Sequence, residues 1–218
     1  MRKYQLKLVA IVMGMMVMAG CGEKRAESTP QLNNMPTAES AASAQESSAA
    51  ESVSGEADAA GSEAEEDLYV LSFEAVTTEG ERVTDSCFAD SKLTMINLWG
   101  TYCNPCLAEM PDLGEIAASY DKADFQLMGI ICDVPEGAEQ KDIDNAKTLI
   151  EKTGANYPHL LLSESLYVNL VGGTDAVPTT FFVNSKGEVL GYVVGANSKD
   201  TWVDLIEQLL AEMETAEQ

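Results

Sequence analysis

From residue 67 onward, apolar residues recur with the spacings of a globular domain in which strands and helices alternate. Apolar runs and period-two alternation predict a hairpin over 72–84 that turns at Glu79-Gly80, and strands over 94–99, 125–132, 160–162, 177–184 and 189–194. Apolar positions three and four residues apart predict helices over 103–120, 142–153, 164–171 and 198–213. This order predicts an α/β domain with a central mixed β-sheet and helices on both of its faces.

The first 20 residues have the pattern of a secretory signal peptide: a basic start, then an apolar run over 8–20 that is shorter than the ~20 residues needed to span a bilayer. Ala19-Gly20-Cys21 resembles a bacterial lipobox, although Met18 replaces the usual Leu, Val or Ile. We therefore predict a lipoprotein signal peptide over 1–20 and a lipidated Cys21, which places the protein at the cell membrane on its extracytoplasmic side. The alternative, an ordinary signal peptide with an incidental cysteine, also leads out of the cytoplasm.

The segment 22–66, between Cys21 and the domain, consists mostly of Ala, Ser and Glu and carries ten acids against Lys24 and Arg25. Such a composition cannot bury enough apolar surface to offset the entropy lost on ordering, so we predict a disordered linker. A flexible chain of this length has a root-mean-square reach of roughly 35–40 Å. The sequence therefore divides into a signal peptide (1–20), a lipidated cysteine with a disordered linker (21–66) and one folded domain (67–218).

The net charge of −23, from 36 acids and 13 bases, argues against partners that are themselves polyanions. Phosphate neutralisation requires clustered Lys and Arg, and the sequence contains no such cluster, so we expect no binding of nucleic acid.

Cys103 and Cys106 are separated by two residues at the start of a predicted helix, which is the arrangement of a dithiol made for disulfide exchange. The helix N-terminus favours the thiolate of the first cysteine, which attacks, while the second resolves the mixed disulfide. Pro105 suits the first helical turn, where its missing N–H has no partner. Zinc is the structural alternative, but a zinc site needs four ligands, and the chain has no second Cys-x-x-Cys and a single histidine, His159. We therefore predict neither a metal nor a cofactor.

The segment from Trp99 to Cys106, with Val177-Pro178-Thr179 about 70 residues later, resembles the thioredoxin fold, and more narrowly the membrane-tethered TlpA/ResA-like proteins. The resemblance covers residues 68–212 and implies that Pro178 is cis and faces the cysteines. It also implies a substrate groove formed by Trp99, Tyr102, Val177 and Pro178; the alternative for Trp99 is a core residue. From the sequence alone, a trans proline opening an edge strand is the alternative for Pro178.

Two polar positions refine the resemblance. Asn97 stands where cytoplasmic thioredoxins carry a buried Asp, so that acid/base group is missing here. Glu109, one helical turn after Cys106, matches an acidic residue of ResA-like proteins. A partly buried carboxylate at this position would oppose thiolate formation and relay a proton to the resolving thiol. The alternative is that Glu109 is an ordinary acid on the helix surface.

The sequence leaves the roles of three further residues undecided. Cys87 and Cys132 are expected to pair with each other, to act as a redox relay, or to be buried free thiols, since free cysteine behaves as a small apolar residue. His159 lies in a predicted turn and is expected to be structural or exposed.

The predicted function is an extracytoplasmic thiol–disulfide oxidoreductase. The resemblance implies a reductase that passes electrons from a CcdA/DsbD-like membrane thiol carrier to an exported protein with a disulfide or oxidised thiol. Apocytochrome c and an extracellular methionine sulfoxide reductase are both candidate clients. The uncharged Asn104 between the cysteines also favours a reductant over a strong oxidant.

Four alternatives remain at this stage: a disulfide oxidase or isomerase, a thiol peroxidase, a Sco-like copper chaperone and a non-enzymatic binding lipoprotein. The peroxidase lacks its Pro-x-x-x-Thr-x-x-Cys setting, and the copper chaperone would need Cys-x-x-x-Cys.

Overall fold

The structure is a computed structural model that describes residues 32–34 and 68–216. The predicted signal peptide, Cys21 and most of the predicted linker lie outside the described residues. None of the helices in the described part of the chain is long and apolar enough to cross a bilayer.

The described elements follow the predicted order closely. They are β1 (Glu74–Val76), β2 (Arg82–Thr84), the 3-10 helix η1 (Asp85–Asp90), β3 (Leu93–Trp99), α2 (Asn104–Ser119), β4 (Phe125–Pro135), α3 (Gln140–Thr153), β5 (His159–Leu162), α4 (Glu164–Asn169), the 3-10 helix η2 (Val171–Gly173), β6 (Thr179–Asn184), β7 (Val189–Val194) and α5 (Lys199–Ala216).

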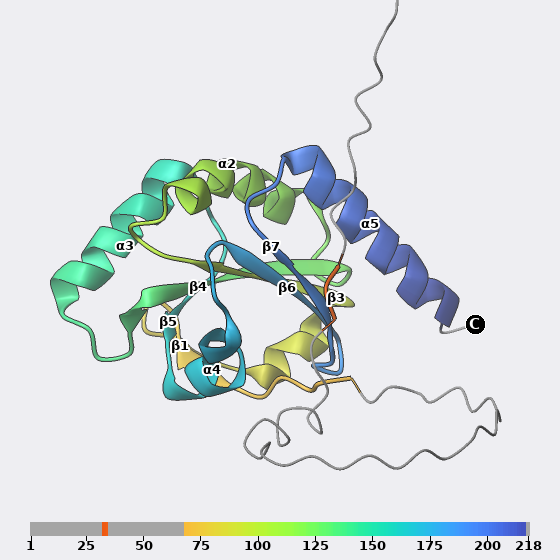
Figure 1. The fold of residues 1–218 in the computed structure, drawn as a ribbon, viewed down its shortest axis with the longest axis horizontal. Coiled ribbons are helices and arrows are strands. Elements are labelled where there is room, and N and C mark those ends of the chain that lie inside the picture. Colours follow the sequence, from red (N-terminus) through yellow and green to blue (C-terminus); the bar gives the residue numbers. More distant parts are fainter. Residues whose placement is uncertain (1–31, 35–67, 217–218) are drawn as a thin grey trace, which may run out of the picture.

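Five strands form the central sheet in the order β5-β4-β3-β6-β7 (Figure 1). The β3–β4 and β4–β5 pairs are parallel, whereas β3–β6 and β6–β7 are antiparallel, which confirms the predicted mixed sheet. The predicted hairpin forms the separate antiparallel ribbon β1–β2. The buried strand β3 lies at the centre of the sheet. The cysteine motif, which follows the carboxyl end of β3, therefore lies midway between the two edge strands, at one end of the sheet.

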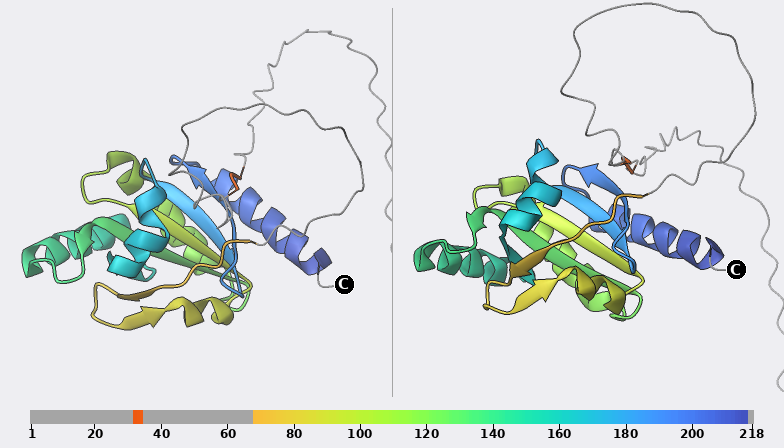
Figure 2. Two further views of the ribbon diagram at one scale, coloured as in Figure 1. Left: turned by 60° about the horizontal axis from the view of Figure 1, so that its bottom comes forward. Right: turned by 90° about the horizontal axis from the view of Figure 1, so that it is seen from below.

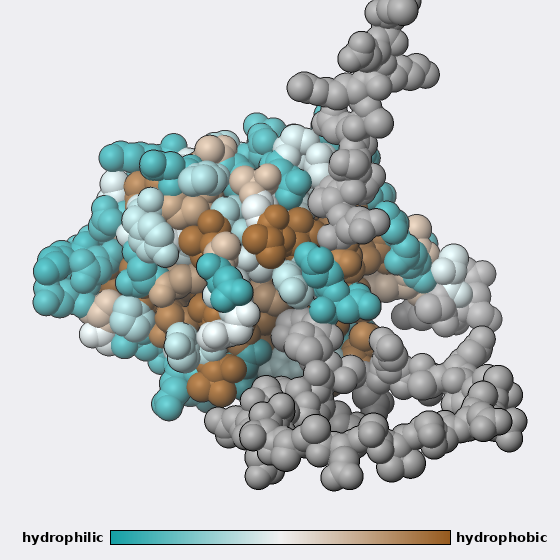
Figure 3. All heavy atoms as spheres, viewed as in Figure 1, coloured by the Kyte–Doolittle hydropathy of each residue, from teal (hydrophilic) through white to brown (hydrophobic). Residues whose placement is uncertain are grey.

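The two faces of the sheet are covered unequally. The long helices α2, α3 and α5 lie along one face, while α4, η1 and the β1–β2 ribbon lie along the other (Figures 1 and 2). Each face has its own buried apolar cluster. Met95, Leu113, Phe182 and Trp202 belong to the cluster under the long helices, and Phe73, Phe88, Ile96 and Phe181 belong to the other. The outward side of α3 is hydrophilic (Figure 3), as expected for a helix that covers the sheet from outside.

Several element boundaries differ from the sequence predictions by one to three residues. The strand predicted to end at residue 132 continues as β4 to Pro135. The helix predicted over 164–171 ends at Asn169, because Leu170 leaves the α-helical path with φ −141° and ψ −59°, and η2 follows it. The last helix runs to Ala216, three residues beyond the prediction. Gly154 ends α3 in the left-handed conformation with φ 69°.

Truncating the side chain of Leu113 tests the packing of α2 on the sheet. Leu113 is fully buried, so Leu113→Ala should lower the free energy of unfolding by about 3 kcal/mol through lost apolar burial and the cavity left behind. Val168→Ala is the control, because that side chain is 70% exposed and its loss should change stability by less than about 0.5 kcal/mol. Urea denaturation of both variants measures the difference, and equal effects would contradict the packing described here.

Candidate active site

Cys103 and Cys106 form a disulfide at the N-terminus of α2. Cys103 is the N-cap residue, and its Sγ accepts a hydrogen bond from the backbone N–H of Cys106 at 3.2 Å. Pro105 lies in the first turn of the helix, as predicted, where no N–H is needed. Cys103 is 5% exposed and Cys106 is completely buried, so Cys103 is the sulfur that a second protein can approach. The turn before the cysteines is held by Asp133, whose carboxylate accepts hydrogen bonds from the backbone N–H and the hydroxyl of Thr101.

The loop before β6 faces the disulfide, as the resemblance implies. The Val177–Pro178 peptide bond is cis, so the alternative of a trans proline is wrong. The carbonyl oxygen of Val177 lies 3.7 Å from Cys103 Sγ. Tyr102 is 69% exposed next to this loop, and it lines a shallow cavity of about 260 Å³ together with Val177 and Cys132. Tyr102, Val177 and Pro178 therefore lie around the accessible sulfur.

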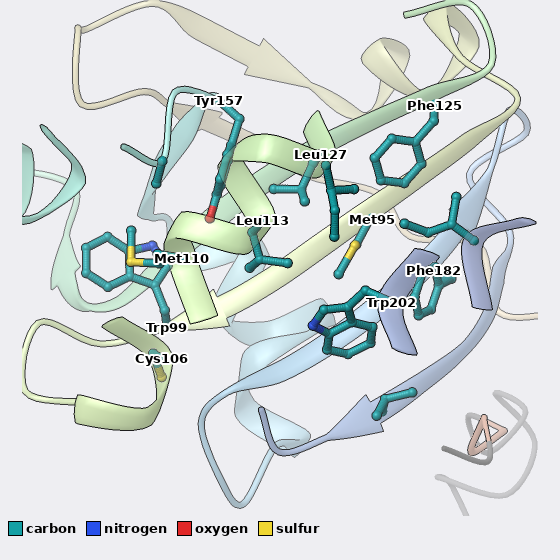
Figure 4. Close-up of a cluster of buried hydrophobic side chains, with 14 of the residues drawn as sticks. Met95, Trp99, Cys106, Met110, Leu113, Phe125, Leu127, Tyr157, Phe182 and Trp202 are labelled. Atoms are coloured by element: carbon teal, nitrogen blue, oxygen red, sulfur yellow. The ribbon is translucent and has the colours of Figure 1, made fainter. Parts of the chain in front are cut away.

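Trp99, predicted to form part of the substrate groove, does not reach the surface. Its side chain is completely buried and lies in the same apolar cluster as Met110 and Cys106 (Figure 4). The indole Nε1–H donates a hydrogen bond to Nδ1 of His159 at 3.1 Å. Trp99 is therefore a core residue that supports the loop carrying the cysteines, and the prediction that it lines the substrate groove is wrong.

His159 is a buried structural residue at the start of β5, 2% exposed, which excludes the alternative of an exposed side chain. Because Nδ1 accepts from Trp99, Nε2 carries the proton and donates to the carbonyl oxygen of Ala155 at 3.1 Å. Burial lowers the pKa of His159 to about 4, so the ring is neutral at physiological pH.

Gly129 makes the contact between Trp99 and His159 possible. It lies on β4 directly beside His159 on β5, and a Cβ atom at this position would come within 2.3 Å of His159 Nδ1 and 3.1 Å of Trp99 Nε1. The missing side chain therefore leaves the space in which the two rings meet. A glycine inside an apolar strand marks such a close approach, and this signal was available in the sequence.

Glu109, one helical turn after Cys106 on α2, is buried, which excludes the alternative of an ordinary surface acid. It is 4% exposed and accepts hydrogen bonds from Asn97 Nδ2 at 3.1 Å, from the backbone N–H of Asn197 at 3.3 Å and from Trp202 Nε1 at 3.4 Å. Burial raises the pKa of Glu109 to about 7, and the three hydrogen bonds oppose part of that shift. A carboxyl group with this pKa can accept or release a proton near neutral pH.

Asn97 and Tyr157 complete the polar surroundings of Glu109. Asn97 also donates to Thr180 Oγ1 at 3.0 Å, so it links the central strand to β6. The Tyr157 hydroxyl points towards α2 (Figure 4), and burial together with the Glu109 carboxylate raises the pKa of this phenol. Within the described residues, the Tyr157 hydroxyl and Asn97 Oδ1 are buried without a hydrogen-bond partner. Sequence reasoning missed Tyr157, because it lies in a loop with no motif around it.

Cys87 and Cys132 are both free thiols, so the pairing considered from the sequence is wrong. Burial raises the pKa of Cys87 to about 11 and that of Cys132 to about 12, and nearby Asp residues add to both shifts. Both thiols are therefore protonated at neutral pH, which makes them poor nucleophiles and does not favour a redox relay.

Comparison with known proteins places these features in a family. Residues 69–191 match the model of the AhpC/TSA family. Similar curated proteins are the thiol-disulfide oxidoreductase ResA of Halalkalibacterium halodurans (25% identity, 56% of this chain and 65% of the relative) and the thiol:disulfide interchange protein HelX of Rhodobacter capsulatus (30% identity, 59% and 66%). The matches thus cover less than two thirds of these relatives' own lengths.

Solved structures show the same fold. A thiol:disulfide interchange protein of the thioredoxin family from Chlorobium tepidum superposes with a TM-score of 0.53 at 26% identity, covering 65% of this chain and 94% of the other. The exposed lipoprotein thioredoxin Etrx1 of Streptococcus pneumoniae has a TM-score of 0.51 at 22% identity, covering 63% and 98%, a likeness of fold alone. The predicted thioredoxin-like fold is confirmed.

Filling the space above Gly129 should break the Trp99–His159 contact. Gly129→Ala should lower the free energy of unfolding by about 2 kcal/mol or more, since the added methyl group would overlap His159. The indole N–H signal of Trp99 in a proton NMR spectrum should shift as its hydrogen bond is lost. Gly173→Ala serves as the control because no atom lies within 4 Å of a Cβ there. An unchanged indole signal in Gly129→Ala would refute this role of Gly129.

The buried carboxyl group of Glu109 predicts a distinctive pH dependence of stability. Because its pKa is about 7 in the folded chain and near 4.5 when unfolded, the folded state binds the proton more tightly. The Glu109 contribution to stability is therefore greatest at low pH, falls between about pH 4.5 and 7, and is constant above. Relative to wild type, oxidised Glu109→Gln should gain on the order of 3 kcal/mol across this window, measured by urea denaturation at each pH. A difference that does not change with pH would be the contrary result.

Proposed function

The chain belongs to the AhpC/TSA family, and we propose that it is an extracytoplasmic thiol–disulfide oxidoreductase of the TlpA/ResA-like type that reduces disulfides in exported proteins. The observation that carries the proposal is the buried Glu109 one helical turn from a disulfide whose first cysteine is the less buried of the two and lies beside a cis-proline loop. The names of the curated relatives agree with this chemistry.

In the proposed reaction the reduced pair meets a client disulfide. The Cys103 thiolate, favoured by the N-terminus of α2, attacks one client sulfur and releases the other as a thiolate that takes up a proton. Cys106 then gives its proton to the Glu109 carboxylate and attacks Cys103 Sγ. The mixed disulfide breaks, the second client sulfur leaves as a thiolate and is protonated in turn, and two electrons have passed to the client.

Glu109 suits the second step because the resolving thiol is buried. Cys106 is completely buried in the disulfide state, and the proton of a reduced thiol at the same position would have little contact with water. A carboxyl group one helical turn away, with a pKa of about 7, can take that proton and later return it. The hydrogen bonds from Asn97 and Trp202 hold the carboxylate in place under the helix.

The direction of electron flow is proposed from the residues between the cysteines. Asn104 and Pro105 carry no charge, so no cation in this loop stabilises the thiolate and hence the reduced form. The pair should then have a potential closer to the roughly −270 mV of thioredoxin than to the roughly −120 mV of a strong oxidant. A membrane thiol carrier of the CcdA/DsbD-like kind would return it to the dithiol state, and the lipid on Cys21 would keep both partners at the same membrane.

The other candidate functions have less support. Both ring nitrogens of His159 are engaged with Trp99 and Ala155, so this residue is not available as the distal ligand of a copper chaperone. An oxidase would run the same steps in the opposite direction, and an isomerase would exchange client disulfides with no net transfer of electrons. A thiol peroxidase would consume peroxide in proportion to the enzyme, and a binding lipoprotein would keep its role after Cys103→Ser.

A redox titration of the chain without its leader tests the proposal. Oxidation state is read by thiol alkylation and mass in glutathione or dithiothreitol buffers, with Cys103→Ser as the control that cannot form the disulfide. We expect a midpoint below about −230 mV. A midpoint above about −150 mV would make the protein an oxidant or isomerase, and the absence of any Cys103–Cys106 disulfide would overturn the oxidoreductase assignment itself.

A further inference from the structure

Residues 32–34, which precede the domain by more than 30 residues, are paired with the edge strand β7. The backbone N–H of Asn33 donates to the carbonyl oxygen of Tyr192, and the N–H of Tyr192 donates to the carbonyl oxygen of Asn33, both at 2.8 Å. The side-chain amide of Asn33 donates to the same Tyr192 oxygen at 3.2 Å. Figures 1 and 2 draw this short segment in orange-red beside the sheet. The edge strand thus accepts an added antiparallel strand.

An apolar contact also holds residues 32–34 against β7, and it depends on a position of β7 that has no side chain. Leu32 packs against the buried cluster beneath the long helices. On β7, Gly191 has a φ of 154°, and a Cβ atom there would come within 2.5 Å of Leu32 Cγ and 2.7 Å of the Asn33 carbonyl oxygen. A side chain at residue 191 would therefore exclude the leucine.

The chain returns to the same edge after residue 67. Val189 N–H donates to the carbonyl oxygen of Tyr69, and Leu71 N–H donates to that of Gly187, both at 2.8 Å. Val70 pairs antiparallel with Glu188, in the same sense as Asn33 with Tyr192. A segment within the predicted linker and the residues just after the linker therefore cover an edge strand that would otherwise present unpaired backbone groups.

We infer that Leu32–Asn34 is a docking strand that fastens the linker to β7 and orients the dithiol end of the domain towards the membrane. In an antiparallel pair, residues before Asn33 lie towards the residues after Tyr192. That end of β7 carries Val194, which pairs with Thr179 beside the cis-proline loop, and Gly195, whose N–H bonds to Pro178. Leu32, the residue of this segment nearest to Cys21 in the sequence, therefore lies towards the end of the sheet that holds the cysteines.

The docking strand also shortens the connection to the lipid; this part rests on the lipidation of Cys21 in the proposed function. Leu32 follows Cys21 by 11 residues, whereas Leu68 follows it by 47. At ~3.6 Å per residue these segments span at most about 40 Å and about 170 Å. Docking thus reduces the greatest distance between membrane and domain about four-fold. A dithiol held in this way suits partners whose cysteines lie at the membrane surface.

Amide hydrogen exchange at Tyr192 tests the docking without any lipid. In the chain over 22–218, the Tyr192 amide should be protected, as is the Val189 amide bonded to Tyr69. Leu32→Asp should accelerate exchange at Tyr192 at least ten-fold and leave Val189 unchanged. Val53→Asp, the same substitution elsewhere in the linker, should change neither. Equal exchange at Tyr192 in the parent and in Leu32→Asp would overturn the docking, and protection that rises with protein concentration would assign the strand to a second copy.

The orientation is tested on the lipidated chain in bilayers that contain spin-labelled headgroups. Signal broadening should be at least two-fold greater at Tyr102, beside the cysteines, than at Lys186 in the turn before β7. Leu32→Asp should abolish that difference while the protein stays membrane-bound. Equal broadening in the parent would refute the orientation. A chain that does not bind the bilayer at all, yet still protects Tyr192, would instead show that the lipidation in the proposed function is wrong.

Discussion

The site depends on the burial of one carboxyl group, that of Glu109. A charge removed from water is costly unless hydrogen bonds compensate it, and here the compensating donors come from three different parts of the fold. Asn97 lies on the central strand, Asn197 in the loop before α5 and Trp202 on α5 itself. Because all three converge on one residue of α2, they fix the position of the helix whose first turn carries the dithiol.

A second buried polar contact, the hydrogen bond between Trp99 and His159, supports the same region of the site. Asn97 pairs across the sheet with Gly129 and Thr180, and Gly129 pairs in turn with His159. Along this row the side chains under α2 are polar or absent, although apolar residues surround them. The Trp99–His159 hydrogen bond supports the end of β3, and the Asn97–Glu109 bond supports the helix that follows. Each buried polar atom with its partner in place makes the loop between Trp99 and Cys103 harder to rearrange.

Local patterns predicted much of this arrangement. The Cys-x-x-Cys spacing placed the dithiol at a helix start, the apolar spacing placed the end of α3 at residue 153, and the resemblance placed the cis proline and Glu109 near the cysteines. The sequence could not pair Trp99 with His159, 60 residues away, because neither residue carries a signal for the other. It also assigned the linker no structure, since three residues on an edge strand leave no periodic pattern. Burial of His159 and the free state of Cys87 and Cys132 depend on strand register, which is a property of the assembled sheet.

The most direct test of this account is the pKa of Glu109 itself. Carboxyl ¹³C chemical shifts of the oxidised protein, followed against pH and assigned with Glu109→Gln, report the titration of this one group. We expect a midpoint near pH 7, well above the ordinary value for a glutamate. A midpoint near the ordinary value of about 4.5 would show that the carboxyl group is solvated, and would remove it as the proton acceptor for Cys106.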